Sequence, residues 1–420
     1  MSISSIKGFN DILPPESDRW RHIEEIARKV FRVNGFSEIR IPIMEKTELF
    51  SRSIGDATDI VEKEMYSFLD KSGSGVTLRP EGTAGVMRAL IQHKLHSQDS
   101  VLKLFYMGPM FRYERPQKGR YRQFNQIGAE ITGTDDPMAD AQLLNLLAAF
   151  FNGLDLKKPE LQINSLGCPE CRPAYRVKLT AFLEKRIESM CEDCRRRFDL
   201  NPLRILDCKL SGCIEATRDA PAMLENLCDD CVNHFNSVQN YLHQSETKFI
   251  INPRMVRGLD YYTRTTFEMV TDQLGSQSAV AAGGRYDGLI SQLGGGDIPG
   301  VGFAMGMERI ALLLGEGSYT APPELFIATI GMKEREFAFG LMNQMMKRGV
   351  HVEMDYEGKS LKSQMRRADR MGASYSVVVG ENEVNSGKAL FRRMSDGAET
   401  EITLAADNIS ELLNPHHTTS

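Results

Sequence analysis

The stretch FYMGPMFRYERPQKGRYRQFNQIGAE, residues 105–130, decides the fold that we expect for this chain. It lies within two β-type runs, 101–113 and 121–133, which flank a short polar turn at 114–120. Consecutive strands joined by so short a turn form a hairpin, in which the strands pair antiparallel. The sequence therefore predicts an antiparallel hairpin here.

The second strand of this hairpin presents different chemistry on its two faces. Side chains alternate along a strand, so Ile127, Ala129 and Ile131 form an apolar face that is expected to join the core. The other face offers a guanidinium, an aromatic ring, an amide, a gap and a carboxylate, which suit a ligand with a phosphate at one end and a cationic or donor group at the other. These five residues are Arg122, Phe124, Gln126, Gly128 and Glu130.

The turn region 112–122 is rich in cations, with five against the single anion Glu114. A charge run alone is usually a solvated surface, but this one adjoins the ligand face. Arginine suits phosphate because its planar group binds oxygens in pairs and stays charged. The five cations are Arg112, Arg115, Lys118, Arg120 and Arg122.

The N-terminal pattern predicts a helix followed by a strand. Residues 19–33 carry apolar side chains at helical spacing, and Gly35 follows as a stop. Residues 38–43, EIRIPI, alternate like a strand, in which Pro42 indicates an edge or interface position.

The rest of the chain divides into segments of different character. Residues 1–159 and 246–318 mix helical and strand patterns, whereas residues 160–245 are helical and charged and contain all eight cysteines. After a linker marked by Pro322 and Pro323, residues 324–420 alternate β-α-β-α-β. That pattern predicts a small α/β domain with a largely parallel sheet.

Composition limits the class of protein. The chain has 420 residues, of which 41% are hydrophobic and 25% charged, and its net charge is −5. These values are typical of a soluble globular protein of two or three domains and argue against one that coats nucleic acid. The longest apolar stretch, around 143–151, is too short for a bilayer, and the N-terminus lacks a signal peptide's apolar core. We expect a cytoplasmic protein without membrane contact, whose cysteines are free thiols or metal ligands.

Residues 105–130 resemble the second signature motif of class II aminoacyl-tRNA synthetases, in the version found in histidyl-tRNA synthetases. Further segments resemble, in order, that family's N-terminal motif, its dimer-forming first motif, its amino-acid-binding turn, its two histidine-specific motifs and the third class II motif. They are KGFNDILPPES (7–17), IPIMEKTELFSRSIGDATDIVEKEMYSF (41–68), TLRPEGTAG (77–85), RGLDYYTRTTFE (257–268), AAGGRYDGL (281–289) and GVGFAMGMERI (300–310). Seven ordered motifs make the match very specific.

This resemblance implies a fold, an activity and partners. The fold is the α+β class II catalytic core, an antiparallel sheet with flanking helices, formed by 1–159 and 246–318. A helical cysteine-rich insertion at 160–245 and an α/β anticodon-binding domain at 324–420 complete it. The implied activity joins L-histidine to AMP, using ATP and Mg²⁺, and then transfers the histidyl group to the 3′ end of tRNA(His). A second copy of the chain is implied as a partner, because the first motif forms the family's homodimer.

The resemblance also implies roles for individual residues. Arg257 would lie between the histidine carboxylate and the α-phosphate, which Arg112 would hold, so these two are the implied catalytic residues. The implied ATP-binding residues are Arg112, Arg120, Phe124 and Arg309, the last two on either side of the adenine. The implied histidine-binding residues are Glu81, Thr83, Gln126, Glu130, Tyr261, Tyr262 and Tyr286, with Glu130 and Tyr262 at the imidazole nitrogens; Gly283 and Gly284 would line the pocket.

Taken singly, several of these residues have a plain structural interpretation. Arg257 would suit an ion pair, Tyr261 or Tyr262 the core, and Glu81 the cap of the helix that follows it. Only the ordered set of motifs favours the functional interpretation.

Contacts with tRNA are implied in two places. In the hairpin turn the resemblance implies Arg115 and Gln117. In the C-terminal segment, four cations spaced 3, 4 and 4 residues apart would share one face of a helix expected over 359–371. Commonly such a face is merely solvated, but beside a synthetase core it resembles the anticodon-binding domain, where phosphates need cations. These four are Lys359, Lys362, Arg366 and Arg370.

The eight cysteines form three C-x-x-C pairs and one pair five residues apart: Cys168 and Cys171, Cys191 and Cys194, Cys228 and Cys231, and Cys208 and Cys213. Two thiolates on one turn reach one tetrahedral zinc ion at about 2.3 Å. A structural zinc held by some subset of them is therefore one interpretation, and buried or oxidation-prone thiols are the other. A catalytic metal is not expected, because family members generally need no zinc for chemistry.

Two alternatives compete with this interpretation. A non-catalytic regulatory paralogue that senses histidine would resemble the core but lack the C-terminal domain and the ATP-binding arginines, whereas Arg112, Arg120, Arg309 and a C-terminal α/β pattern are present. A synthetase for another amino acid would lack the two histidine-type motifs. The sequence therefore favours the histidine-activating enzyme.

Overall fold

The computed structural model describes residues 3–55, 58, 60–156, 159–257, 259, 261–274, 279–317 and 319–413. The chain forms two compact units, Met1–Gly317 and Ser318–Ser420. Among the described residues, none of the helices combines the length and the apolar character needed to cross a bilayer.

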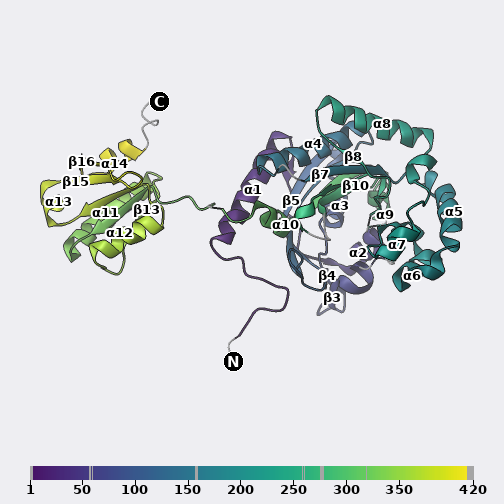
Figure 1. Ribbon diagram of the computed structural model, residues 1–420, viewed down its shortest axis with the longest axis horizontal. Helices are drawn as coiled ribbons and strands as arrows, with labels where there is room; N and C mark the ends of the chain where they lie inside the picture. Colours follow the sequence, from purple (N-terminus) through teal and green to yellow (C-terminus); the bar gives the residue numbers. More distant parts are fainter. Residues whose placement is uncertain are drawn as a thin grey trace. The chain divides into compact units, whose positions relative to one another are not determined.

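The first unit is built on an eight-stranded sheet with the order β1-β5-β6-β11-β10-β9-β7-β8 (Figure 1). Its inner strands pair antiparallel, and the edge pairs β1–β5 and β7–β8 are parallel. The expected α+β core is thus confirmed. The strands are Ser37–Glu38 (β1), Leu102–Phe111 (β5), Gln123–Thr132 (β6), Gly300–Gly306 (β11), Ala279–Arg285 (β10), Thr263–Val270 (β9), Glu160–Ser165 (β7) and Ile250–Ile251 (β8).

Strands β5 and β6 form the predicted hairpin and pair antiparallel along their whole length. Ile127, Ala129 and Ile131 of β6 are buried in the main hydrophobic core, as the alternation predicts. On the opposite face of the same strand, Phe124 and Gln126 line a cavity. The sheet therefore separates the core from the candidate site.

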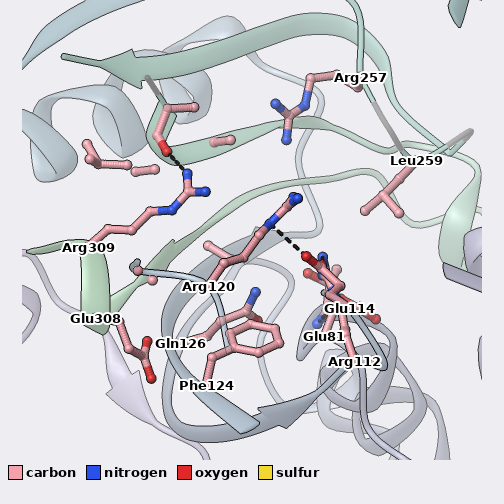
Figure 2. Close-up of a pocket in the computed structure, with 18 of the residues that line it drawn as sticks. Glu81, Arg112, Glu114, Arg120, Phe124, Gln126, Arg257, Leu259, Glu308 and Arg309 are labelled. Atoms are coloured by element: carbon pink, nitrogen blue, oxygen red, sulfur yellow. Dashed lines mark hydrogen bonds and ion pairs between the residues drawn. The ribbon is translucent and has the colours of Figure 1, made fainter. Parts of the chain in front are cut away.

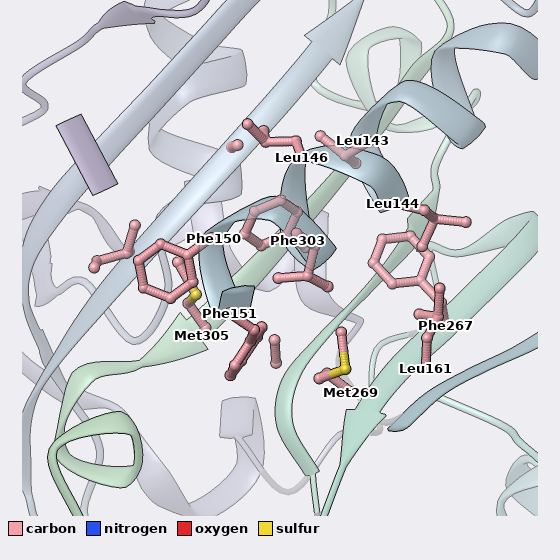
Figure 3. Close-up of a cluster of buried hydrophobic side chains, with 14 of the residues drawn as sticks. Leu143, Leu144, Leu146, Phe150, Phe151, Leu161, Phe267, Met269, Phe303 and Met305 are labelled. Atoms are coloured by element: carbon pink, nitrogen blue, oxygen red, sulfur yellow. The ribbon is translucent and has the colours of Figure 1, made fainter. Parts of the chain in front are cut away.

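Helices α1 (Glu16–Val33) and α4 (Pro137–Gly153) cover the core face of this sheet. Helix α1 buries Trp20, Ile23, Ala27 and Phe31 at helical spacing. The leucines and phenylalanines of α4 pack in one core with Phe303 of β11 and Phe267 of β9 (Figure 3). Full burial of each such side chain contributes about 1.5–3 kcal/mol, so this layer stabilises the sheet and leaves its other face for the site.

A buried ion pair joins α4 to β10. The side chains of Asp140 on α4 and Arg285 on β10 are both fully buried, and Arg285 Nε donates to an Asp140 carboxylate oxygen at 3.1 Å. Arg285 also donates to Asp287 and to the Thr134 carbonyl, each at 3.0 Å. Removing one partner of such a pair costs about 3–5 kcal/mol. The pair therefore fixes β10, one wall of the cavity, against the core.

A smaller three-stranded sheet, β2-β4-β3, follows β1 in the sequence. The strand predicted over 38–43 is wrong in part, because β1 ends at Glu38 and β2 begins at Met44. The guanidinium of Arg79 donates hydrogen bonds to the carbonyls of Ile41 and Pro42, at 2.7 and 3.3 Å. Pro42 also has no N–H to donate to a neighbouring strand. The elements here are Met44–Lys46 (β2), Thr47–Ile54 (α2), Ile60–Glu64 (η1), Tyr66–Leu69 (β3), Gly75–Leu78 (β4), Thr83–Gln92 (α3) and Leu95–Ser97 (η2).

The cysteine-rich segment begins with a strand of the large sheet, because β7 pairs with β9. Its helices follow from Cys171 onwards, so the insertion starts later than the residue 160 expected from the sequence. Helices α5 to α7 gather on one side of the unit (teal in Figure 1), and α8 packs on α4. They are Cys171–Glu184 (α5), Ile187–Ser189 (η3), Glu192–Leu200 (α6), Pro202–Asp207 (η4), Ser211–Ala216 (α7), Met223–Asn226 (η5) and Asp229–Gln244 (α8); the unit ends with Asp272–Leu274 (η6), Leu289–Gln292 (α9) and Met307–Leu314 (α10).

The second unit contains a five-stranded sheet with the order β13-β12-β14-β15-β16. The first three strands are parallel, as the β-α-β-α-β pattern predicts. Two antiparallel strands that the β-α-β-α-β pattern does not predict, β15 and β16, extend the sheet. The elements are Leu325–Thr329 (β12), Met332–Lys347 (α11), Val352–Met354 (β13), Leu361–Arg370 (α12), Tyr375–Val379 (β14), Glu381–Ser386 (α13), Lys388–Arg393 (β15), Glu399–Thr403 (β16) and Ala406–Leu413 (α14).

Candidate functional site

A cavity of about 300 Å³ opens on the face of the large sheet opposite to the core. Strands β6, β10 and β11, the turn after β5 and the loop before β9 line it. Residues from motifs far apart in the sequence come together here. The sequence-predicted site residues among the lining are Glu81, Thr83, Arg112, Arg120, Phe124, Gln126, Arg257, Tyr261, Tyr262 and Arg309.

Arginines from separate elements reach into this cavity (Figure 2). Arg120, in the hairpin turn, has its Nε 2.7 Å from a carboxylate oxygen of Glu114, and Arg112 lies 3.8 Å from the other oxygen. Arg309, on α10, donates to the carbonyl of Ala279 on β10. Burial, and next the charge of Arg120, lower the pKa of Arg309. So much positive charge in a half-enclosed space favours a polyanionic ligand.

Arg257 enters the cavity from another side, in the loop before β9. Its guanidinium lies 2.6 Å from the carboxylate of Glu268 and 5.2 Å from the centre of the Tyr262 ring. Burial lowers the pKa of Arg257, but the neighbouring Tyr262 and Glu268 outweigh it, so the pKa is raised and the group stays charged. Arg257 therefore forms the ion pair of the structural interpretation and also lines the cavity.

The end of the cavity near α10 can stack a planar group. The Phe124 ring lies there, with the guanidinium carbon of Arg112 5.3 Å from its centre. Beside it, the buried carboxylate of Glu308 accepts the backbone N–H of Asn125 at 2.8 Å. Burial raises the pKa of Glu308 to about 7. An aromatic face with a guanidinium group beside it suits a heterocyclic base.

Glu81 lines the cavity and caps a helix at the same time. Its carboxylate accepts the backbone N–H groups of Thr83 at 2.6 Å and Ala84 at 2.9 Å, at the start of α3. The capping interpretation is thus correct, and it fixes the orientation of the carboxylate. Burial raises the pKa of Glu81, while the two backbone donors and Arg112 lower it.

Glu130 is fully buried and does not belong to the cavity lining. One carboxylate oxygen accepts the Thr83 hydroxyl at 2.7 Å, and the other accepts the Tyr286 hydroxyl. Burial raises its pKa to about 8, although these two donors lower it. The gap expected at Gly128 is wrong, because the protein's own Tyr106 fills it: a Cβ at Gly128 would lie 2.2 Å from Cζ of that ring.

Three tyrosines form an aromatic wall next to Glu130. The ring of Tyr261 lies 4.7 Å from that of Tyr262 and 5.9 Å from that of Tyr286, measured between centres. Burial raises the pKa of each, so their hydroxyls stay protonated. Tyr261 and Tyr262 line the cavity, whereas Tyr286, Gly283 and Gly284 do not belong to its lining.

The residues expected to contact tRNA lie outside the cavity. Arg115 and Gln117 are exposed in the hairpin turn. In the second unit, the expectation that Lys359 belongs to the basic helix is wrong. Helix α12 begins at Leu361, because the Lys359 N–H is held at 2.9 Å by the carboxylate of Asp355 in the preceding turn. The remaining cations of the stripe are exposed on α12: Lys362, Arg366 and Arg370.

The eight cysteines are free thiols that form two groups of four. Within each group, all sulfur atoms lie within 4.8 Å of one another. The first cluster is Cys168, Cys171, Cys228 and Cys231, and the second cluster is Cys191, Cys194, Cys208 and Cys213.

Sequence reasoning missed three residues of this site. Glu114, the single anion of the turn, holds Arg112 and Arg120 in place, a role that the charge pattern of the turn does not predict. Glu308, next to Arg309 in the chain, was visible only as part of a motif. Tyr106 fills the space at Gly128 because the two are cross-strand partners, and that register was not predicted.

Comparisons with known proteins agree along the whole chain. The family model described as Histidyl-tRNA synthetase matches residues 8–310, and the Anticodon binding domain model matches residues 324–414. The Histidine--tRNA ligase of Pelobacter propionicus is 66% identical over 98% of this chain and 100% of its own length, and that of Geobacter sulfurreducens is 62% identical over 97% and 99%. The crystal structure of apo S. aureus histidyl-tRNA synthetase is 34% identical, with a TM-score of 0.81 over 99% of both chains.

Proposed function

The chain belongs to the histidyl-tRNA synthetase family, and we propose that its cavity activates L-histidine with ATP and then transfers the histidyl group to tRNA(His). The observation that carries this proposal is the meeting of residues from separate motifs in one cavity. That cavity combines an arginine-rich end with an end lined by tyrosines and a capping carboxylate. The two ends suit a nucleoside triphosphate and an amino acid, which must lie side by side to react.

The arginine-rich end is assigned to ATP. Arg112 would bind the α-phosphate and Arg120 the outer phosphates, which would replace Glu114 as partners of the two guanidinium groups. Phe124 and Arg309 would stack on the two faces of the adenine. Both interactions use groups that already line the cavity.

Arg257 is assigned to the chemical step. A histidine carboxylate oxygen would attack the α-phosphorus, the bond to the bridging oxygen of the β-phosphate would break, and pyrophosphate would leave. Negative charge builds up on the phosphate oxygens during this displacement. A partly buried guanidinium that is already held by Glu268 would stabilise that charge without reorganisation. In the second step a hydroxyl of the terminal ribose of tRNA attacks the histidyl carbonyl, and AMP leaves.

The tyrosine end is assigned to histidine. Glu81, Thr83 and Gln126 would surround the amino group, and Tyr262 would meet one imidazole nitrogen. Glu130 would meet the other, and the Thr83 hydroxyl connects it to the cavity. Histidine would then replace this hydroxyl as a partner of the buried carboxyl.

Two metal ions belong to the proposal. Mg²⁺ binds through one or two carboxylates together with phosphate oxygens; Glu114, a carboxylate in the cavity, fits this role, and the ion would neutralise phosphate charge. Zn²⁺ is proposed as a structural ion of the cysteine-rich insertion, supported by the arrangement of its thiols in two groups of four. No chemical step is assigned to zinc.

The proposed partners are tRNA and a second copy of the chain, in the cytoplasm where tRNA is used. The second unit matches an anticodon-binding model, and its exposed stripe on α12 supplies cations for phosphates. Dimerisation through the three-stranded sheet is supported by apolar side chains that are 45–72% exposed. They are Ile43, Met44, Phe68 and Leu69.

Amino-acid-dependent exchange of labelled pyrophosphate into ATP tests the proposal. Exchange that requires histidine and no other amino acid would support it. Histidine binding without exchange would instead indicate the regulatory paralogue, which the retained arginines and the second unit argue against. Exchange driven by a different amino acid would overturn the substrate assignment.

A further inference from the structure

Three sulfur–sulfur distances in the two cysteine clusters match those of a tetrahedral metal site, and within each cluster all sulfurs lie within 4.8 Å of one another. Cys168 Sγ lies 3.6 Å from Cys171 Sγ and 3.8 Å from Cys228 Sγ, and Cys191 Sγ lies 3.9 Å from Cys208 Sγ. Sulfurs bound tetrahedrally to one zinc ion at about 2.3 Å are about 3.8 Å apart, whereas a disulfide requires about 2.05 Å. Four sulfurs that all approach one another enclose a space for one ion.

Backbone amides around the sulfurs support the same conclusion. The N–H of Cys228 donates to Cys171 Sγ at 3.1 Å, and the N–H of Cys191 donates to Cys213 Sγ at 3.3 Å. Such donors stabilise thiolates, the form in which cysteine binds metal. Each thiol loses its proton to the solvent as its sulfur binds the ion.

The first cluster is connected to the wall of the histidine site. Immediately after the C-x-x-C turn, the guanidinium of Arg172 donates to the carbonyl of Tyr262. Immediately before that turn, Leu166 and Gly167 exchange backbone hydrogen bonds with Arg264, at 2.7 and 2.9 Å. Both contacts fix the chain where the pocket loop, the described residues 252–257, 259, 261 and 262, enters β9.

The second cluster is connected to the other end of the same loop. Cys213 accepts, at its carbonyl, the hydroxyl of Thr217 at 2.9 Å. Arg254 of the pocket loop donates to the Thr217 carbonyl at 2.6 Å and to its hydroxyl at 2.8 Å. Arg257 follows three residues later, so this contact lies directly before the residue assigned to the chemical step.

We infer that the two clusters are separate four-cysteine zinc sites, and that together they fix both ends of the loop that carries Arg257, Tyr261 and Tyr262. The described part of this loop contains neither helix nor strand, so contacts with the rest of the unit, among them those at its two ends, hold it in position. Arg172 and Arg254 are positioning residues that act through the loop. The inference about catalysis rests on the proposed function, whereas the inference about metal does not.

Metal analysis of the purified full-length protein tests the two sites. We expect about two zinc ions per chain, and about one in each of the variants Cys168→Ser/Cys171→Ser and Cys191→Ser/Cys194→Ser. Chelation should lower the unfolding temperature, and Zn²⁺ should restore it. Metal-free protein whose thermal unfolding does not respond to added Zn²⁺, or iron in place of zinc, would overturn the assignment. These measurements involve neither ATP nor histidine, so they remain valid if the proposed activity is absent.

Paired arginine variants test the link to the pocket. Arg172→Ala should raise the KM for histidine about tenfold, the effect of losing one hydrogen bond from a charged donor, with unchanged zinc content and an ATP KM within twofold. Arg172→Lys keeps a donor and should recover part of the loss. The control is Arg176→Ala, one helical turn further along α5, whose side chain bonds the Asp199 carbonyl within the insertion.

The second contact has its own pair, Arg254→Ala with Arg218→Ala as control, since the exposed Arg218 side chain pairs with Glu215. Here too a rise in the KM for histidine is expected for the first variant alone. If the two variants of a pair have equal kinetics, the link between that cluster and the pocket loop is overturned, even if both zinc ions are present. Absence of pyrophosphate exchange in the unmodified protein would instead be a failure of the proposed function.

Discussion

Replacing Glu130 with glutamine tests how a buried carboxyl shapes this site. Folding raises its pKa from 4.5 to about 8, so the folded chain keeps a proton that the unfolded chain releases between these values. Stability from this group is therefore complete below pH 4.5 and is lost as the pH rises towards 8. At pH 7 the loss amounts to about 3 kcal/mol. Glutamine does not titrate, so Glu130→Gln should be more stable than the parent near pH 7, by up to that amount, and should lack this pH dependence.

The same substitution should weaken histidine binding. Near pH 7 the carboxyl of Glu130 is protonated in the folded chain, but it can pass this proton to an imidazole and become a charged acceptor, which the amide of glutamine cannot do. One charge-assisted hydrogen bond is worth about 1.5–3 kcal/mol. The KM for histidine should therefore rise about tenfold to a hundredfold. The KM for ATP should change little, because Glu130 contacts Thr83 and Tyr286 rather than the arginines.

Histidine titration by pyrophosphate exchange, paired with thermal unfolding at pH 5, 6, 7 and 8, measures both effects. Thr83→Ser is a matched control, because it keeps a hydroxyl donor to Glu130. A folded glutamine variant with the parental histidine KM would refute the binding role. The free energy of unfolding of the parent should fall between pH 5 and 8 relative to that of the variant. If it does not, the pKa argument is refuted.

The remaining predictions concern the chemical step, the packing of the sheet and the second unit. Arg257→Ala should lower kcat for adenylate formation about 100- to 1,000-fold at nearly constant ATP KM; an increased ATP KM with unchanged kcat would contradict the assigned role. Gly128→Ala places a Cβ 2.2 Å from the Tyr106 ring and should lower the free energy of unfolding by about 1–3 kcal/mol. Gly306→Ala, with no atom within 4 Å of its Cβ, is the control, and equal denaturation midpoints would show that Tyr106 moves aside freely. Deleting residues 318–420 should leave histidine-dependent exchange measurable but weaken tRNA charging and make it less salt-dependent, so charging at the parental level would assign this unit another task.

The parts of this site that sequence predicts are those set locally or by motif. Alternation along β6 separates Ile127 from Gln126 because the two faces of a strand depend on that strand alone. The β-α-β-α-β order of the second unit follows in the same way. The strand expected over 38–43 fails because Arg79, far along the chain, takes the carbonyls that a ladder would use. The gap at Gly128 fails for a related reason, since Tyr106 reaches it across the register of two strands.

The cysteine clusters show most clearly what local spacing leaves open. A C-x-x-C turn specifies two ligands, and the choice of the other two is a matter of chain topology. Here the second cluster lies entirely within the segment that the first cluster closes, with Cys168 and Cys228 60 residues apart and Cys191 and Cys208 only 17. Closing the longer loop costs about 1 kcal/mol more conformational entropy than closing the shorter one. The second cluster is therefore the inner site and the first cluster the outer site. If the inner site forms first, it shortens the free chain that the outer site must close, which makes the pairing of the more distant cysteines easier. The outer site is the one whose neighbouring Arg172 holds Tyr262, so we expect the position of this part of the pocket to depend on the whole insertion being folded.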